Sequence, residues 1–558
     1  MTGNGSADQP GPGEVGGMVA SGSGAVGTVA SGVVAGGTVA AGHSAAADAA
    51  ARILELGGNA FDAVLAAGFA SVVCEPGFTS LGGGGFLLAR SVEHGDILFD
   101  FFVDTPGRGL NGDVLEPVFE EVVVNFAAAD QVFHCGPGSV AVPGILAGYL
   151  HVHSRLATLP LREILAPAIE LATSGVAVSP TQAVDFQLLS PILARTEASR
   201  SIFFPTGTLL AEGDILHNPD LGAFLDQLGG ASPETFYRGE MARRFVEQIR
   251  SGGGLITLED LARYRVIERK PLAVPYRGRT LMTNPPPTFG GALLGLALRR
   301  VQETVGGSDE LGPTGPANRA AVADMTDPVA RAAVLGAAMQ SVDRDRAGGH
   351  PDVLAALAGD LGDDPLARPV ATRGTTHVTV TDSFGNVASM TTSNGECSGD
   401  VISGTGITCN NMLGEDDLHP DGFHAAPAGE RVASMMSPSI VVGASGDALL
   451  ALGSGGSKRI RSALLQVLVA VLDGGVGLQD AVDAPRFHWN EDRFEVEPGL
   501  SEDVLDALGQ VGPVNEWPSK SMYFGGVHAI GLGQGEVGQG GAGDARRGGA
   551  VRHVPRRG

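Results

Sequence analysis

Cysteine is scarce in this sequence, and its four copies are not spaced as metal-binding or redox pairs are. Cys74, Cys135, Cys397 and Cys409 are scattered through 558 residues without CxxC spacing. A disulfide framework or a zinc knuckle needs clustered cysteines, so neither is expected. We predict that the four thiols are small core side chains, and we predict no metal or organic cofactor.

Long hydrophobic runs and an excess of positive charge are also missing. The chain has no run of about 18 apolar residues, the length needed to span a bilayer. Residues 1–35 also lack the basic and apolar regions of a secretory signal. With 37 basic and 62 acidic residues the formal net charge is −25, which repels nucleic acid and anionic membranes. The sequence therefore predicts a cytoplasmic protein without nucleic-acid or membrane partners; a periplasmic or secreted location is the alternative.

Common hydrolase and nucleotide-binding motifs are absent as well. The chain holds no GxSxG, HExxH or EF-hand loop. Its glycine run "SLGGGGF", residues 80–86, has neither dinucleotide-binding nor P-loop spacing. We interpret this run as close backbone packing beneath a site.

The composition divides the chain into four parts. Residues 1–35 are predicted to be a disordered N-terminal extension, and the low-complexity residues 533–558 a disordered tail. The regions 36–374 and 375–532 are predicted to fold. The first of them ends in a linker, about 303–374, that is rich in glycine, proline, aspartate and arginine.

A β-hairpin begins abruptly where that linker ends. Residues 375–381 alternate and are rich in β-branched types, "DSFGN" is typical of a tight turn, and "VASMTTS" returns as a second strand. If the bond between Gly374 and Thr375 were cut, the freed α-amine would place a base beside the Thr375 hydroxyl. Such an amine titrates at about 7.7 to 8.0, which suits proton transfer at neutral pH. The alternative is that Thr375 merely starts an edge strand.

The hairpin and its flanking motifs resemble the gamma-glutamyltransferases, members of the N-terminal nucleophile hydrolases. The resemblance covers about residues 38–500 and includes, in order, "VAAGHSAAADAAARILELGGNAFDAV", "SLGGGGF", "GSVAVPG", "TTHVTVTDSFGNVASMTTS", "GTGITCNNM", "SMMSPSIV", "GSGGSKRI" and "DAPRFH". It implies an α+β fold, the four-layer αββα sandwich. It also implies a precursor that cuts itself between Gly374 and Thr375 into a large subunit, residues 36–374, and a small subunit, residues 375–532.

Catalytic roles follow from the resemblance, motif by motif. Thr375 is similar to the family's nucleophile, and Ser393 to a threonine whose hydroxyl bonds to that nucleophile. In "GSGGSKRI", Gly456 and Ser457 match the oxyanion positions, whose backbone N–H groups face the developing alkoxide. A glycine-rich turn that opens a helix presents free N–H groups, which agrees with this role.

The pocket for the γ-glutamyl head group departs from the family pattern. The D-F-R motif, whose arginine clamps the α-carboxylate, here reads D-F-F and ends at Phe102, so the bidentate contact is lost. Arg108 is the nearest candidate replacement in the sequence. The family's paired serines read Ser434 and Met435, so one hydroxyl is lost too.

The acidic residues that the resemblance assigns to the α-ammonium lie in "NNMLGEDDLHP". Asp417 aligns with the family's aspartate, and Glu415 and Asp416 are its expected partners. Asn394 is a further expected substrate contact. These residues would bind the end of the substrate that the missing arginine also served.

Three functions remain open at this stage. The leading interpretation is a self-processing γ-glutamyltransferase or glutathione hydrolase that acts through a threonine acyl-enzyme and passes the acyl group to water or an amine. The second is an acylase, similar to cephalosporin acylases, for acyl amides without an α-amino acid head, which the lost arginine favours. The third is a non-catalytic family member, against which the retained Thr375, Ser393 and glycine turn argue.

Overall fold

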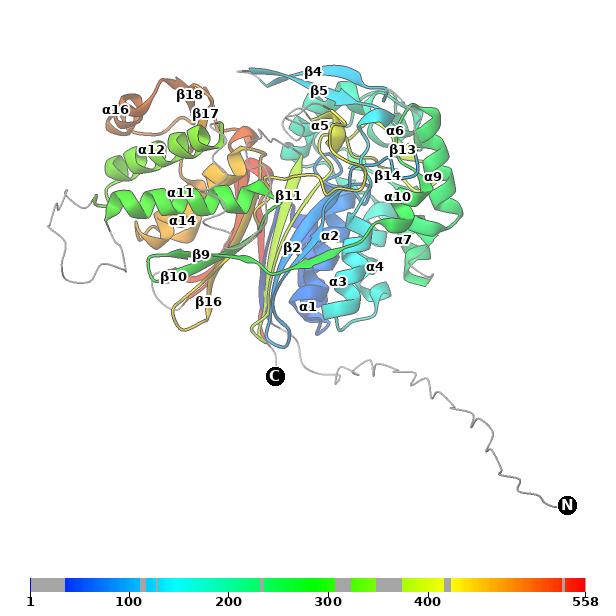
Figure 1. The fold of residues 1–558 in the computed structure, drawn as a ribbon, viewed down its shortest axis with the longest axis horizontal. Coiled ribbons are helices and arrows are strands. Elements are labelled where there is room, and N and C mark those ends of the chain that lie inside the picture. Colours follow the sequence, from blue (N-terminus) through cyan, green and yellow to red (C-terminus); the bar gives the residue numbers. More distant parts are fainter. Residues whose placement is uncertain are drawn as a thin grey trace. The chain divides into compact units, whose positions relative to one another are not determined.

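The strand that begins at Thr375 lies inside a seven-stranded antiparallel sheet built from both halves of the sequence (Figure 1). The computed structural model describes residue 1 and residues 36–110, 117–126, 129–230, 235–306, 323–347, 374–415, 423–533 and 537–556. In spatial order the strands are β22 (Ala550–Val554), β1 (Gly37–Ala41), β11 (Thr375–Asp382), β12 (Val387–Ser393), β2 (Gly84–Ser91), β3 (Gly95–Phe101) and β8 (Ile267–Arg269).

A second antiparallel sheet, of six strands, packs face to face with the first. Strands β11 and β12 contact its strand β16, and β11 also contacts β20. The spatial order is β21 (Gln539–Ala542), β20 (Gly526–Leu532), β16 (Ala448–Gly455), β15 (Ser439–Val442), β10 (Arg279–Thr283) and β9 (Leu272–Tyr276). The two inner faces therefore enclose the start of β11.

Helices cover the outer face of each sheet. The seven-stranded sheet is covered by α1 (Ser44–Glu55), α2 (Ala60–Cys74) and α3 (Ile145–Leu156), and α4 (Leu161–Ser174) packs on α2. The other is covered by α11 (Phe289–Val305) and α14 (Arg459–Leu472), with α12 (Pro328–Ala347) and α16 (Glu502–Val511) packed further out, as Figure 1 shows. The predicted α+β, four-layer αββα sandwich is confirmed.

The amino-acid pattern explains the burial of these layers. Helix α2 is apolar on every side and is buried along its whole length, and a capping box of Asn59 and Asp62 satisfies its first N–H groups. Strands β11 and β12 are buried on both faces. All four cysteines are buried and unpaired, as predicted for core side chains.

Smaller elements surround the sandwich near the start of β11. They are α5 (Pro180–Leu193), α6 (Glu197–Phe203), α7 (Pro219–Gly230), α9 (Glu240–Ser251), α10 (Leu258–Arg263) and the hairpins β4–β5 (Glu120–Phe126, Ala129–Cys135), β6–β7 (Val176–Ala177, Ile215–Leu216) and β13–β14 (Val401–Ile402, Ile407–Thr408). A separate three-stranded sheet is formed by β17 (Phe487–Asn490), β18 (Arg493–Val496) and β19 (Val514–Glu516). No helix among the described residues is long and apolar enough to cross a membrane.

The prediction of a disordered tail at 533–558 is wrong for residues 537–556. They form β21 and β22, and β22 pairs with β1 along its whole length. Between the two strands, Asp544 is fully buried; it pairs with Arg486 at 2.5 Å and accepts an N–H from Val527 at 3.0 Å. The segment has little apolar pattern because it is held by buried charge pairs with distant residues, which local composition does not reveal.

Other parts of the predicted domain division lie outside the described residues. These are the N-terminal extension from residue 2 to 35 and two stretches of the linker, 307–322 and 348–373. Between those stretches the chain forms α12, a 20-residue helix that packs on α11 and α16. The region assigned to the linker is thus in part a layer of the sandwich.

Candidate functional site

Thr375, the first residue of β11, is fully buried. Side chains two apart on a strand share a face, so Thr375 faces the same way as His377. His377 meets Gly453 of the second sheet, where an added Cβ would collide with the imidazole ring. The threonine hydroxyl therefore faces the space between the sheets, and within the described residues its Oγ1 has no hydrogen-bond partner.

The polar side chains that follow Thr375 on the same face of the sheet bond to one another. His377 bonds through Nδ1 to Thr391 Oγ1 and through Nε2 to Thr379 Oγ1, each at 2.8 Å. Burial lowers the pKa of His377 well below its usual value, so the ring is neutral at pH 7. A neutral ring bonded to two threonines stiffens the strand that presents Thr375.

Ser393 lies directly opposite Thr375 on β12. Its hydroxyl donates a hydrogen bond to the carbonyl oxygen of Gly374 and accepts one from the N–H of Gly395 at 3.1 Å. In the uncut chain Ser393 thus contacts the carbonyl before Thr375, whereas the resemblance assigns it to the Thr375 hydroxyl. That carbonyl belongs to the bond whose cleavage the sequence predicts.

An arginine from the C-terminal segment holds the other side of Thr375. Arg547 is buried; its Nη1 donates to the carbonyl oxygen of Thr375 at 3.1 Å, and its guanidinium carbon lies 5.1 Å from the ring centre of Phe78. Sequence reasoning missed Arg547 because it assigned this segment to a disordered tail. A buried-charge pattern in "DARRGG" was the signal available, and it is a weak one.

The turn that carries Gly456 and Ser457 follows β16 and precedes α14. Gly455, the last residue of β16, lies so close to Thr375 that an added Cβ would collide with the Thr375 carbonyl oxygen. Gly456 has φ +123° and Ser457 has φ +57°, backbone conformations that glycine adopts freely and serine rarely does. The structure therefore brings the two predicted oxyanion residues beside the start of β11, at the N-terminal end of a 14-residue helix.

The strand register links Thr375 to Phe102 across the sheet. Thr375 pairs with Ser393, and Ser393 pairs with Gly84 of β2. Phe102 directly follows β3, and its ring covers Gly84, where an added Cβ would lie 2.9 Å from Phe102 Cδ2. Since neighbouring strands are about 4.8 Å apart, Phe102 lies about 14 Å from Thr375 along this row.

Phe102 is a core residue. Its ring stacks on Phe86 with the centroids 5.5 Å apart and an interplanar angle of 20°, and both side chains are fully buried. Met435, the other predicted departure, is fully buried in the same hydrophobic cluster. Two positions that the resemblance assigns to a carboxylate clamp are therefore apolar.

The arginines near Phe102 are engaged with the protein. Arg108 donates to the Gly429 carbonyl at 2.9 Å and lies 3.8 Å from Asp104. Arg431 donates to the carbonyl of Phe102 and pairs with Asp104 at 3.1 Å. Burial raises the pKa of Asp104 to about 6, although both arginines oppose that shift. The Arg108 guanidinium is thus held by the Gly429 carbonyl through one of its nitrogens.

The structure describes three of the five remaining predicted substrate contacts. Asn394 is buried and donates through Nδ2 to Thr408 Oγ1 at 3.3 Å. Glu415 is buried beside Gly395, where an added Cβ would lie 2.6 Å from its Oε1. Ser434 is buried, and its Oγ accepts the N–H of Met436 at 3.1 Å. Asp416 and Asp417 lie outside the described residues.

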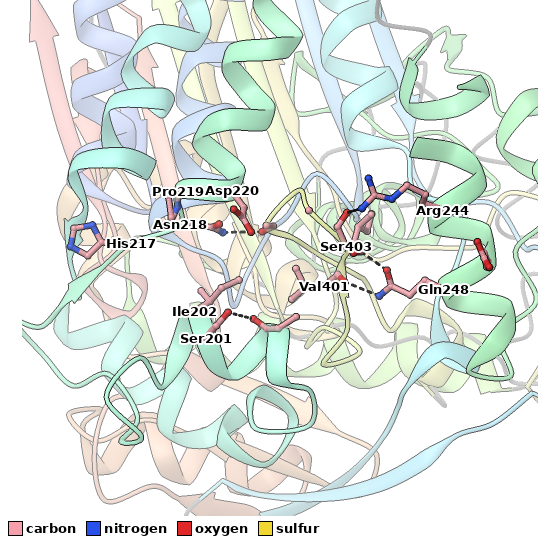
Figure 2. A pocket seen from close by; sticks show the side chains of 15 residues that line it. Ser201, Ile202, His217, Asn218, Pro219, Asp220, Arg244, Gln248, Val401 and Ser403 are labelled. Carbon is pink, nitrogen blue, oxygen red and sulfur yellow. Dashed lines mark hydrogen bonds between the residues drawn. The ribbon is translucent and has the colours of Figure 1, made fainter. Parts of the chain in front are cut away.

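A hollow that Thr375 does not line is found between α6, α7, α9 and the β13–β14 hairpin (Figure 2). Its volume is about 700 Å³, and Figure 2 shows Gln248 bonded to the backbone of Val401 and Ser403 across it. None of the sequence-predicted site residues lines this hollow. We place the candidate site at Thr375, where the reactive groups converge. Among the described residues no cluster of three or more histidine, cysteine, aspartate or glutamate side chains could hold a metal ion.

Comparisons with known proteins identify the family of this chain. A family model described as gamma-glutamyltranspeptidase matches residues 46–554. The chain is 31% identical over 486 residues to the glutathione hydrolase proenzyme of Escherichia coli (strain K12), covering 82% of each chain. It is 32% identical over 469 residues to the acylase ACY 1 proenzyme of Pseudomonas sp. (strain V22), covering 82% of this chain and 84% of that one.

A solved structure shows the same fold. The cephalosporin acylase from Bacillus halodurans superposes with a TM-score of 0.73 at 24% identity, covering 94% of this chain and 97% of that one. At this identity the likeness establishes the architecture and leaves the substrate open.

Proposed function

Because the chain belongs to the gamma-glutamyltranspeptidase family, whose members are enzymes of the N-terminal nucleophile hydrolase type, we propose that it is a self-processing threonine amidohydrolase. Thr375 is the nucleophile, and its acyl group passes to water or to an amine. The substrates are small acyl amides. The large subunit, residues 36–374, and the small subunit, from residue 375 onward, come from one precursor.

The hydrogen bond from Ser393 to the Gly374 carbonyl carries this proposal. Attack by the Thr375 hydroxyl on that carbonyl would place negative charge on the oxygen that Ser393 already contacts. The Gly395 N–H bonded to Ser393 Oγ orients the hydroxyl for this task. Cleavage would convert the buried amide of Thr375 into an α-amine, which then serves as the base for every later turnover.

Turnover of a substrate uses the same nucleophile with a second oxyanion site. The backbone N–H groups of Gly456 and Ser457 would face the tetrahedral oxyanion of the bound amide. Their left-handed backbone aims successive N–H groups to one side, and α14 adds the positive end of its dipole. Since the backbone acts here, a serine in place of a glycine is tolerated.

The geometry favours an acyl group without an α-amino acid head. Phe102 covers Gly84 in the row that leads away from Thr375, and Met435 is buried nearby in the same cluster. An α-carboxylate placed against these side chains would lose its hydration without gaining a cation. The function supported best is therefore an acylase-like amidohydrolase.

Hydrolysis of γ-glutamyl amides is the second candidate. Asn394, Glu415 and Ser434, which the resemblance assigns to the head group, are all present and buried. Glu415 lies next to Gly395 and so within one residue of Asn394. A carboxylate and an amide at this point suit an α-ammonium group, which an acylase substrate lacks.

The test is intact mass followed by paired kinetics. We expect two chains, residues 1–374 and 375–558, and hydrolysis of a butyryl anilide with higher kcat/KM than a γ-glutamyl anilide, which adds the α-amino group and the α-carboxylate. A reversed preference would select the second candidate. An uncut chain without amidase activity would contradict the proposal and leave the non-catalytic alternative.

A further inference from the structure

The cut between Gly374 and Thr375 needs a base that the α-amine cannot provide, because before the cut that amine is part of an amide. The hydroxyl proton of Thr375 must leave as its oxygen attacks, and the nitrogen of Thr375 must gain a proton as it departs. Within the described residues the hydroxyl has no hydrogen-bond partner. A group that handles this proton must therefore reach the site by way of a water molecule.

A small cavity lies beside Gly374. Its volume is about 20 Å³, which is room for one water molecule. Its lining includes Gly374 and four ionisable side chains, Asp185, Glu396, Arg459 and Arg547, among apolar and aromatic residues. A water molecule here would have the two or more polar partners that a buried water requires.

Asp185, on α5, differs from the other charged residues of the cavity. Only 6% of its surface is exposed, yet among the described residues its carboxylate makes no hydrogen bond or ion pair. Its Oδ2 lies against the backbone of Gly77, and the Gly77 carbonyl in turn lies against Gly374. Gly77 therefore lies between the Asp185 carboxylate and Gly374.

We propose that Asp185, through one water molecule in this cavity, takes the hydroxyl proton of Thr375 during self-cleavage and returns it to the nitrogen of Thr375. The Oγ1–C bond to Gly374 forms while the C–N bond breaks, which gives an ester and a free amine. A water molecule then hydrolyses the ester, giving its OH to Gly374 and its remaining proton to Thr375 Oγ1. This inference rests on the proposed function.

The charges that face Asp185 suit a group that exchanges protons near neutral pH. Burial raises the pKa of Asp185 to about 7; Arg547 opposes this shift, and the carboxylates of Glu396 and Glu75 add to it. Arg459 also lines the cavity. Glu75 is a poorer choice for the same task because its Oε1 accepts the hydroxyl of Thr376 at 2.9 Å, and Thr376 faces the opposite side of β11.

The experiment follows cleavage of freshly synthesised full-length chain between pH 5.5 and 9. In wild type the rate constant should rise about tenfold per pH unit below 7 and then level off. Asp185→Asn, which keeps the side-chain shape, should slow cleavage by about 100-fold or more and remove this inflection. Glu396→Gln, the matched change in the same cavity, should keep the inflection.

Molecules of Asp185→Asn that have been cut slowly provide the second readout. Counted per free Thr375 N-terminus, their amide hydrolysis should match wild type within about twofold, because the α-amine is then the base. Equal damage to cleavage and hydrolysis would assign Asp185 a structural role and overturn the inference, as would an unchanged pH profile in Asp185→Asn or loss of the inflection in Glu396→Gln.

Two further outcomes separate this inference from the proposed function. A wild-type chain that never cuts itself contradicts the proposed function, whereas normal cleavage in Asp185→Asn contradicts only the role of Asp185. If Asp185→Asn yields no folded precursor, Asp185→Glu decides, because a displaced carboxylate should move the inflection. An inflection at the wild-type pH in that variant would overturn the inference.

Discussion

The two ends of the row from Thr375 to Phe102 differ in how closely their residues match the family pattern. At the Thr375 end, the predicted hydroxyl and glycine turn lie together, and Ser393 contacts the carbonyl of Gly374. At the Phe102 end, an aromatic ring stacked on Phe86 stands where an arginine is expected. The same strands position both ends, so the reaction and its selectivity can change independently.

This difference has a physical origin. The Thr375 end depends on backbone groups and a hydroxyl whose places are fixed by strand register, and few substitutions would preserve them. The Phe102 end depends on which side chain lies over Gly84, and here the Phe102 ring fills that space.

The largest effect is expected for Thr375→Ala. Removing the hydroxyl removes the attacking atom, so the chain should remain in one piece and show no amidase activity. Electrophoresis and intact mass would check this. Two chains from the variant would mean that another protease or another nucleophile makes the cut.

Ser393→Ala should come next in size. Loss of one oxyanion donor typically costs about 100- to 1,000-fold in rate, so uncut chain should accumulate in a time course of cleavage. Ser393→Thr, which keeps the hydroxyl, should cleave at close to the wild-type rate. If alanine and threonine behave alike, the contact with the Gly374 carbonyl does not assist the reaction.

At the other end of the row, Phe102→Arg should change selectivity more than rate. A charge-assisted bond to a carboxylate is worth about 1.5 to 3 kcal/mol, or roughly 10- to 150-fold. The ratio of kcat/KM for a γ-glutamyl anilide to that for a butyryl anilide, which lacks the α-amino group and the α-carboxylate, should rise by about this factor.

Arg108→Ala is the matched control for Phe102→Arg. Because the Arg108 guanidinium is bonded to the Gly429 carbonyl, its removal should leave that ratio unchanged. A selective loss of γ-glutamyl hydrolysis in Arg108→Ala would show that Arg108 reads the head group, and the present account of the Phe102 end would be wrong.

The smallest effect is expected for Ser457→Ala. The proposed oxyanion contact uses the backbone N–H, so kcat should stay within about threefold of wild type. Alanine is also strained at φ +57°, as serine is, so the melting temperature should change little. A loss comparable to that of Ser393→Ala would assign a direct role to the Ser457 hydroxyl.

The structure around Thr375 could be predicted from the sequence because the sequence signals for it lie close together in the chain. Alternation and a turn predict the β11–β12 hairpin, and the start of the hairpin at Thr375 directs attention to the nucleophile. The order of the motifs then implied the αββα layers, which the structure confirms.

Residues whose role depends on distant contacts could not be predicted in this way. Arg547 lies in a glycine-rich segment without apolar periodicity, and its bond to Thr375 spans 172 positions of the chain. Asp185 sits in an ordinary helical sequence, and only the fold brings it to Gly374. The hydrogen bond from Arg108 to Gly429 could not be predicted either. For that reason the sequence alone suggested Arg108 as a replacement for the lost arginine.

The order of strands at one edge of the seven-stranded sheet decides how the cut molecule would refold. Strand β1 precedes the cut in the chain, and it is hydrogen-bonded between β11 and β22, which both follow the cut. Unfolded precursor finds this arrangement within one molecule, whereas unfolded cut enzyme must bring two chains together, so its recovery becomes second order in protein. The precursor is thus the form in which the sheet assembles, and cleavage makes the assembled state hard to regain once it is lost.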